Sequence, residues 1–82
     1  MYPQARFHLP SELGGLIRSD FERVIEQANL GKENEQIAKL YFVDKMPQID
    51  VAAELDITRK TVGRRLPYIM ERMQNTSRQL YS

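Results

Sequence analysis

Apolar residues recur every three or four positions along most of the chain, which is the spacing of amphipathic helices rather than of strands. The first such stretch predicts a helix at about 12–29, with Ser11 as its N-cap and Gly31 beyond its end. Its apolar positions are Leu13, Leu16, Ile17, Phe21, Val24, Ile25 and Ala28. A second helix is predicted from about Glu33 to the "DKMP" stretch, with Tyr41 on its buried side.

A short third helix is predicted at about 47–55, because proline is favoured in the first turn of a helix. Four apolar residues are expected to lie close together on it: Ile49, Val51, Ala52 and Leu55. The "DIT" stretch then turns the chain, with Ile57 pointing inward. Thr58 can cap a fourth helix by accepting a hydrogen bond from a backbone amide of the next turn.

Pro67 interrupts the pattern of the fourth helix. Proline removes one internal hydrogen bond and disfavours helical geometry at the residue before it. The fourth helix is therefore either short, at about 59–66, or longer and kinked at Pro67. In the first case "PYIMERM" forms the next helix, with the proline in its first turn.

The elements fit an all-α fold, a compact domain of four to five helices preceded by an arm. Residues 1–10 contain two prolines and alternate apolar with polar side chains, so we expect an extended N-terminal arm. Residues 11–82 are expected to form a single domain, because a chain of 82 residues can build one hydrophobic core but not two.

Charge is distributed unevenly along the chain. Residues 1–56 contain 6 basic and 10 acidic side chains, whereas residues 57–82 contain 6 basic side chains and 1 acidic one. This asymmetry indicates a polyanionic partner for the basic part, either nucleic acid or an anionic membrane surface. Membrane binding is disfavoured because no large aromatic or leucine face lies opposite the basic residues.

Other features argue against catalysis. The chain has no cysteine and a single histidine, His8, so neither a metal site nor a cofactor is expected. Asp50 and Glu54 are one helical turn apart, but they face away from the apolar stripe, where nothing favours acid–base chemistry. We therefore expect a protein that is not an enzyme.

No stretch has the apolar length of a signal peptide or a membrane span, so a cytoplasmic location is expected.

The positive charge is concentrated in "TRKTVGRRL", where no acidic residue occurs. With about 100° per residue, Val62 and Leu66 point in nearly the same direction, which must be the core. Lys60, Thr61 and Arg64 then face outward.

Two further arginines, Arg59 and Arg65, lie on the flanks of this outward face. Arg59 lies among the unsatisfied amides of the first helical turn, where backbone and side chain together can bind a phosphate. Gly63 has no side chain, which lets its flank approach a neighbouring surface closely.

The stretch "VAAELDITRKTV" has its apolar and small residues where a DNA-binding helix-turn-helix needs them. A small residue allows the two helices to cross closely, Leu55 and Ile57 seal the inside of the turn, and Val62 fastens the second helix. The stretch 33–73, "ENEQIAKLYFVDKMPQIDVAAELDITRKTVGRRLPYIMERM", resembles region 4 of bacterial sigma-70-type factors and the small proteins that share its helix-turn-helix.

This resemblance implies a helix-turn-helix at about 47–66. "IAKLYFVDK" is similar to the supporting helix of that module, "PQIDVAAEL" to its first motif helix and "TRKTVGRRL" to its recognition helix. Where the family's turn usually has glycine, this chain has Asp56, for which we expect a positive φ. Nothing in the chain resembles the region that recognises and melts the other promoter element, so we expect a free-standing module rather than a complete sigma factor.

The predicted function is sequence-specific binding of double-stranded DNA, as a transcriptional or mobile-element regulator. The predicted DNA-binding residues are Thr58, Arg59, Lys60, Thr61, Arg64 and Arg65. The alternative is a protein-interaction adapter that uses the same basic face, for example on RNA polymerase.

A homodimer is a second expectation. Ile69, Met70 and Met73, together with the first helix, offer more apolar surface than a short four-helix domain needs to bury. Pairing would also place two recognition helices on one duplex. The competing interpretation is that these residues close the core of a monomer.

Overall fold

The computed structural model describes residues 16–81, which contain helices and no strand. The elements are α3 (Arg18–Gln27), α4 (Lys32–Ala38), η1 (Lys39–Val43), α5 (Gln48–Leu55) and α6 (Arg59–Tyr81). The prediction of an all-α fold is therefore confirmed for this part of the chain. The predicted arm at residues 1–10, His8 and the predicted N-cap Ser11 lie outside the described residues.

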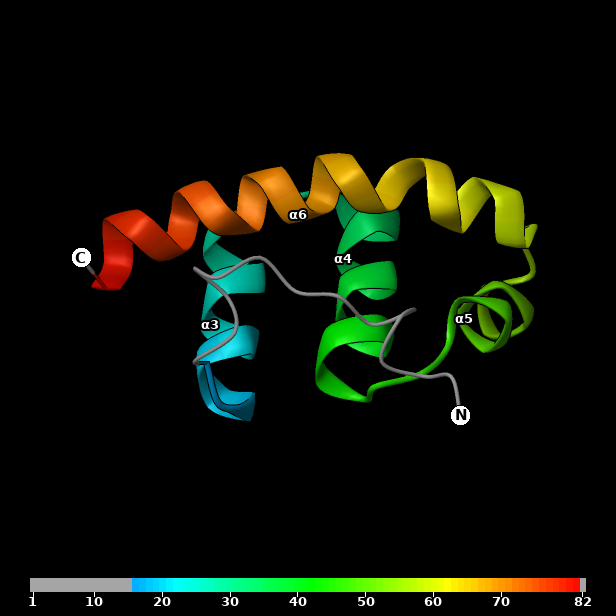
Figure 1. Ribbon diagram of the computed structural model, residues 1–82, viewed down its shortest axis with the longest axis horizontal. Coiled ribbons are helices and arrows are strands. Elements are labelled where there is room, and N and C mark those ends of the chain that lie inside the picture. The colour runs from blue at the N-terminus through cyan, green and yellow to red at the C-terminus, as the bar shows by residue number, and fades with distance from the viewer. Residues whose placement is uncertain (1–15, 82) are drawn as a thin grey trace.

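The long helix α6 runs along one side of the molecule, and the shorter helices pack against it (Figure 1). In Figure 1, α5 lies beneath the beginning of α6, α4 beneath its middle and α3 beneath its C-terminal part. Arg72 ties α6 to the end of α3, because its Nη2 donates a 2.7 Å hydrogen bond to the Ala28 carbonyl. At the other end of α6, its first turns and α5 form one end of the molecule (Figure 1).

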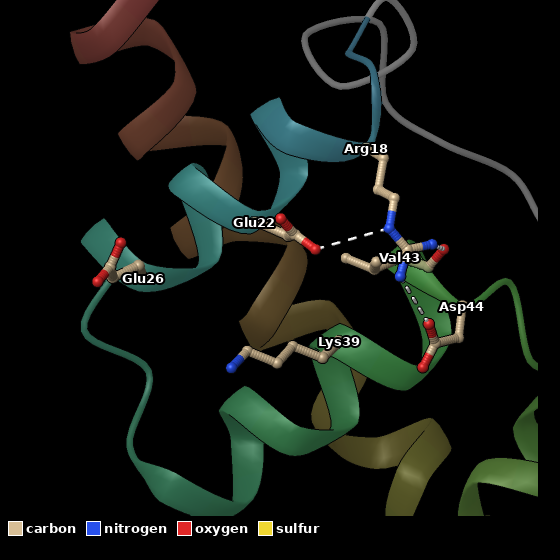
Figure 2. Close-up of a pocket in the computed structure, with 6 residues that line it drawn as sticks. All are labelled: Arg18, Glu22, Glu26, Lys39, Val43 and Asp44. Atoms are coloured by element: carbon tan, nitrogen blue, oxygen red, sulfur yellow. Dashed lines mark hydrogen bonds and ion pairs between the residues drawn. The ribbon is translucent and has the colours of Figure 1, made fainter.

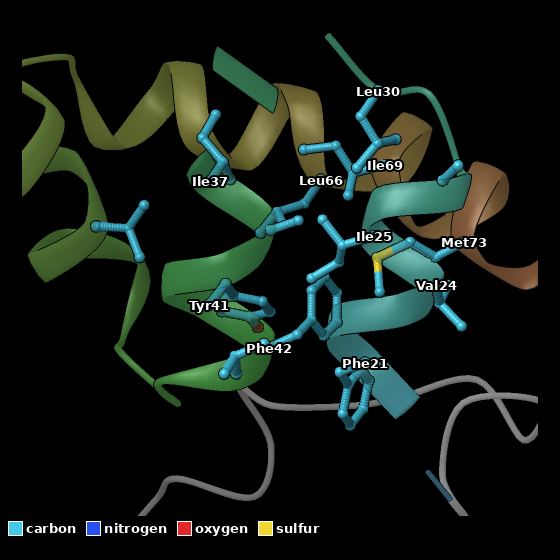
Figure 3. Close-up of a cluster of buried hydrophobic side chains, with 14 of the residues drawn as sticks. Phe21, Val24, Ile25, Leu30, Ile37, Tyr41, Phe42, Leu66, Ile69 and Met73 are labelled. Atoms are coloured by element: carbon cyan, nitrogen blue, oxygen red, sulfur yellow. The ribbon is translucent and has the colours of Figure 1, made fainter. Parts of the chain in front are cut away.

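The core lies where α3, η1 and α6 meet (Figure 3). Phe42 is fully buried there, stacked on Phe21 with ring centroids 5.9 Å apart and meeting the edge of Tyr41 at 5.0 Å. Such aromatic pairs contribute about 0.5–1.5 kcal/mol each beyond the area that they bury. These rings fix α3 relative to η1, and the buried Leu66, Ile69 and Met73 of α6 belong to the same core.

Helix α3 begins later than the sequence pattern predicted. Leu16 and Ile17 are not helical, and Ile17 has an extended backbone and a side chain that is 65% exposed. The Asp20 carboxylate accepts a 3.3 Å hydrogen bond from the Ile17 backbone amide, which defines the start of the helix at Arg18. The apolar spacing of Leu16 and Ile17 was therefore misleading, although Leu16 still packs on the core.

The second predicted helix is observed as α4 and η1, which follow each other without a break. The π-helical turn of η1 closes with a 3.0 Å hydrogen bond from the Asp44 amide to the Lys39 carbonyl. Three consecutive side chains of this turn are buried: Tyr41, Phe42 and Val43. The prediction that Tyr41 is a core residue is confirmed.

Pro67 neither ends nor shortens the fourth helix, because α6 continues through it from Arg59 to Tyr81. The proline side chain is exposed, whereas Leu66 and Ile69 on either side of it are buried. Packing of one apolar stripe on both sides of the proline offsets the single hydrogen bond that the proline cannot donate. Of the two predicted alternatives, the longer helix is the one observed, and "PYIMERM" is part of α6.

The side chain of Ile49 does not join the predicted apolar cluster of the third helix. It is 63% exposed, whereas Val51 and Ala52 are buried and Leu55 packs partly against the core. At about 100° per residue, Ile49 lies more than a quarter turn from the direction that the other three share. Pro47 precedes the helix as its N-cap instead of lying within its first turn.

Most of the apolar residues that suggested a homodimer lie inside the core. Ile69 and Met73 have no exposed surface, and Phe21 on α3 is only 2% exposed. This is the competing interpretation, in which these residues close the core of a monomer. Met70 is partly buried against the same core, and Ile17 from the predicted first helix is 65% exposed, so a homodimer stays a prediction.

Candidate nucleic-acid interface

Helices α5 and α6 are joined by a tight turn at residues 56–58. Asp56 has the left-handed conformation, with φ 58° and ψ 44°, so the predicted positive φ is confirmed. The Ile57 amide donates to the Ala52 carbonyl at 3.0 Å and the Asp56 amide to the Ala53 carbonyl at 3.3 Å. This pair of hydrogen bonds is the Schellman pattern that ends many helices, and it reverses the chain within three residues.

Thr58 caps α6 as predicted. Its Oγ1 accepts a 3.1 Å hydrogen bond from the Thr61 backbone amide, and the two threonine hydroxyls lie 2.9 Å apart. The Val62 amide donates to the Thr58 carbonyl at 3.2 Å, so the helical hydrogen bonds start at once. The Thr61 side chain was expected to face outward, but it is only half-exposed because it is held by this cap.

The inner side of α6 is anchored by Val62 and Leu66, which are 0% and 4% exposed. Gly63 faces α5: a Cβ at this position would lie 3.4 Å from Oε1 of Gln48. This is an ordinary contact distance to the end of a flexible side chain, so the flank of Gly63 lies against the first turn of α5 without requiring glycine there. These contacts fix the rotation of α6 about its own axis.

The beginning of α6 presents three cations to solvent, Lys60 and Arg64 on the side opposite Val62 and Arg59 on its flank. Arg59, Lys60 and Arg64 are exposed, and none of them has an ion pair or hydrogen bond to another residue within 16–81. Arg23 on α3 and Lys32 on α4 are also exposed and lack such a partner within 16–81, but each lies alone on its helix. Arg59, Lys60 and Arg64 therefore form a basic surface at the beginning of α6, where three unpaired cations lie within six residues.

Arg65 lies beside this surface but has partners on α4. Its Nη1 is 2.6 Å from Oε1 of Glu33 and donates a 3.2 Å hydrogen bond to Oδ1 of Asn34. Its side chain remains 39% exposed. Helical spacing placed Arg65 on the flank but gave no sign of Glu33, which is distant in sequence and is brought close only by the packing of α4 on α6.

The start of α6 adds backbone donors to these cations. The amides of Arg59 and Lys60 precede the first helical hydrogen bond and have no partner among the described residues. Free amides at the positive end of a helix dipole favour an anion such as a phosphate. The arrangement can therefore hold phosphate groups at its edge and offer longer side chains to whatever lies between them.

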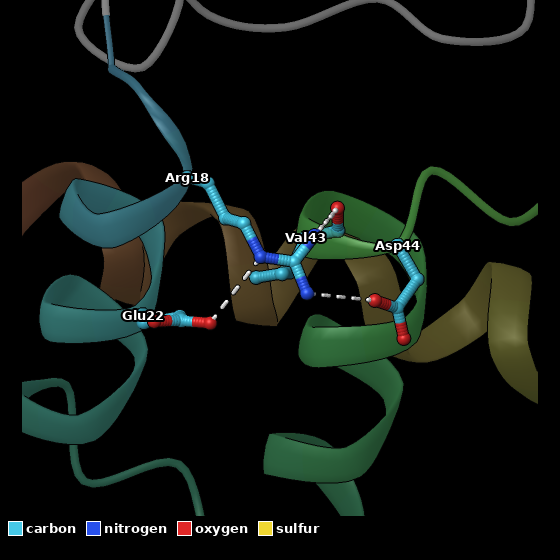
Figure 4. A network of polar contacts seen from close by, with 4 residues as sticks. All are labelled: Arg18, Glu22, Val43 and Asp44. Atoms are coloured by element: carbon cyan, nitrogen blue, oxygen red, sulfur yellow. Dashed lines mark hydrogen bonds and ion pairs between the residues drawn. The ribbon is translucent and has the colours of Figure 1, made fainter.

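A pocket between α3 and η1 has a different character (Figure 2). Its lining side chains carry both charges and are largely paired within the chain. Arg18 bridges Glu22 at 3.6 Å and Asp44 at 3.5 Å, and it donates to the Val43 carbonyl at 3.4 Å (Figure 4). This network ties α3 to the end of η1 and leaves the pocket without a converging set of one charge. Within residues 16–81, no three acidic, histidine or cysteine side chains are placed to bind a metal ion.

Tyr81 lies at the far end of α6 from the cations. Its hydroxyl donates a 3.2 Å hydrogen bond to Oδ1 of Asp20. Desolvation, followed by the negative charge of Asp20 and this hydrogen bond, raises the pKa of the Tyr81 hydroxyl above its ordinary value. This contact joins the last turn of α6 to the first turn of α3 and has no part in the basic surface.

Comparisons with known proteins returned no matching family model, no matching curated protein and no matching solved structure. In the described part of the chain, no helix combines the length and the apolar character needed to cross a membrane.

Proposed function

We propose that the chain binds double-stranded DNA through a helix-turn-helix, with α5 as its first helix and the beginning of α6 as its recognition helix. The observation that carries this proposal is the set of three exposed, unpaired cations at the beginning of α6, of which Lys60 and Arg64 lie opposite the buried Val62. The binding would be sequence-specific, and the protein would act as a regulator of transcription or of a mobile element.

The dimensions of the two partners support this proposal. The major groove of B-DNA is about 12 Å wide and admits one α-helix of about 10–12 Å diameter. The start of α6 lies at one end of the molecule, backed by the short helix α5 (Figure 1). Insertion there would leave the rest of the domain outside the groove.

The side chains divide into two groups by their direction. Lys60 and Arg64 point away from the anchored side of α6 and are placed to reach base edges, where arginine pairs with guanine through two hydrogen bonds. Arg59, with the free amides beside it, is placed to bind a phosphate. Thr58 supports this end of the helix as its cap, and Thr61 shares that hydrogen-bonded pair.

Selection of bound sequences from a pool of random duplex DNA tests the proposal. We expect one sequence motif to be enriched. The affinity for the selected duplex and for random duplexes is then measured at about 50 and 150 mM salt. Arg64→Ala should relax the preference at one or two base pairs, with a loss of about 1–3 kcal/mol of discrimination. Arg78→Ala is the matched control, because it removes the same charge from the last turn of the same helix.

The outcome separates DNA binding from the adapter alternative. If the wild type bound no duplex at about 50 mM salt, where phosphate contacts are strongest, DNA binding would be wrong. The basic surface would then have to serve an acidic protein partner. If Arg64→Ala and Arg78→Ala behaved alike on the selected duplex, α6 would not contact the bases through the face that carries Lys60 and Arg64.

A further inference from the structure

The contacts of Arg65 form a chain of hydrogen bonds that begins in the loop before α4. The Asn34 side-chain amide donates to the Leu30 carbonyl at 3.3 Å, which orients its Oδ1 toward α6. That oxygen accepts from Nη1 of Arg65, and Glu33 pairs with the same nitrogen. The guanidinium is therefore held by two neighbouring residues of α4, one of which is itself fixed by the backbone.

Both contacts use the same nitrogen of the guanidinium. An arginine has five N–H donors, of which Nη1 carries two, so Nη2 and Nε keep three. No other residue within 16–81 takes these donors. The Nη2 and Nε edge is the fork that binds a phosphate through two parallel hydrogen bonds.

We propose that Glu33 and Asn34 are positioning residues that hold Arg65 in place for a phosphate of the DNA backbone. This inference rests on the proposed DNA-binding function. A long side chain loses conformational freedom when it binds, and one that is already ordered loses less. Glu33 and Asn34 thus pre-order Arg65 while leaving its phosphate-binding edge open.

The opposing effect is the charge of Glu33, which repels phosphate and neutralises part of the charge of Arg65. Glu35 provides the matched control, because it also lies in the first turn of α4 and pairs with Lys39 instead. Glu33→Ala and Glu35→Ala raise the net charge equally and remove the same kind of side chain. Only the first one removes a contact of Arg65, so the difference between them isolates the positioning effect of Glu33.

The experiment measures duplex affinity and its salt dependence for these variants in the wild-type and Arg65→Ala backgrounds. Glu33→Ala should bind about two- to tenfold more weakly than Glu35→Ala, the range expected for one side chain that must be ordered again on binding. This difference should vanish when Arg65 is alanine, because the two residues then have nothing to couple. Glu33→Gln keeps an acceptor near Arg65 without the charge, so it should bind at least as tightly as the wild type.

Circular dichroism of each variant confirms that it is folded before affinities are compared. If Glu33→Ala bound duplex as tightly as Glu35→Ala, or more tightly, Glu33 would only neutralise Arg65 and the positioning role would be wrong. The same conclusion would follow if Glu33→Gln were as weak as Glu33→Ala. If no variant and not even the wild type bound duplex, the proposed function itself would fail, and the positioning role with it.

Discussion

The left-handed residue in the turn between α5 and α6 offers a test of how this turn is held. Asp56 has φ 58°, is exposed, and has no side-chain hydrogen bond to another described residue. A left-handed backbone costs a typical L-residue about 1–2 kcal/mol, and aspartate less. Glycine adopts it without this strain.

Asp56→Gly should therefore be neutral or mildly stabilising. Relief of strain contributes up to about 1 kcal/mol, and removal of a negative charge from the C-terminus of α5 adds about 0.3 kcal/mol or more. The greater freedom of glycine in the unfolded chain costs about 0.4–1 kcal/mol. With full relief of the strain, the net gain is about 0.3–0.9 kcal/mol, which raises the melting temperature by at most about 8 °C in a domain of this size.

Asp56→Ala is the matched control for the backbone. It also removes the carboxylate, but alanine must adopt the left-handed conformation with its full strain. Thermal unfolding followed by circular dichroism should place the alanine variant about 1 kcal/mol below the glycine variant, because the strain of alanine exceeds the entropic cost of glycine in the unfolded chain. Equal stability of the two variants would refute the argument from φ. A clear loss of stability in both would show that the carboxylate itself supports the turn.

Two further predictions concern α6. Met73→Ala should lower the free energy of unfolding in denaturant by about 2–5 kcal/mol, because the side chain is 0% exposed. Tyr68 is exposed, so Tyr68→Ala should lower it by about 0.5 kcal/mol or less. Equal losses would contradict the buried position of Met73. Folding raises the pKa of Tyr81, chiefly by desolvation and then by Asp20, so its contribution to stability is present below the unfolded pKa of about 10 and is lost as pH rises through the folded value. The stability advantage of the wild type over Tyr81→Phe should therefore shrink as pH rises above about 10, and a constant difference would be evidence against the shift.

Features set by a few neighbouring residues could be predicted from the sequence. The Thr58 cap depends on one hydroxyl and an amide three residues later, and the positive φ of Asp56 follows from how a helix ends. The outward direction of Lys60 and Arg64 follows from the helical period once Val62 is taken as buried. The exposure of both cations confirms their outward direction.

Features that depend on packing between distant residues could not be predicted in this way. Pro67 locally indicates a helix end, and only the burial of Leu66 and Ile69 on the same core explains why α6 continues through it. The Glu33–Arg65 pair is invisible for the same reason, since α4 and α6 are far apart in the chain. Apolar spacing alone also placed Ile17 and Ile49 in buried positions, and both are exposed.

The distribution of charge also limits how a duplex can approach. The exposed face of α5 carries Asp50 and Glu54, so phosphates are repelled from that side of the motif and attracted to the cations of α6. Helix α3, with further acidic residues, packs near Arg72, which is eight residues or about 12 Å along α6 from Arg64. That distance exceeds the Debye length of about 8 Å at physiological salt, so these acids weaken the field at Arg64 only slightly.

A chain with a net charge of +1 can thus attract DNA in one orientation while having little general affinity for polyanions. The dependence of affinity on salt should accordingly be shallow, because only the few cations at the start of α6 can release counterions from the duplex.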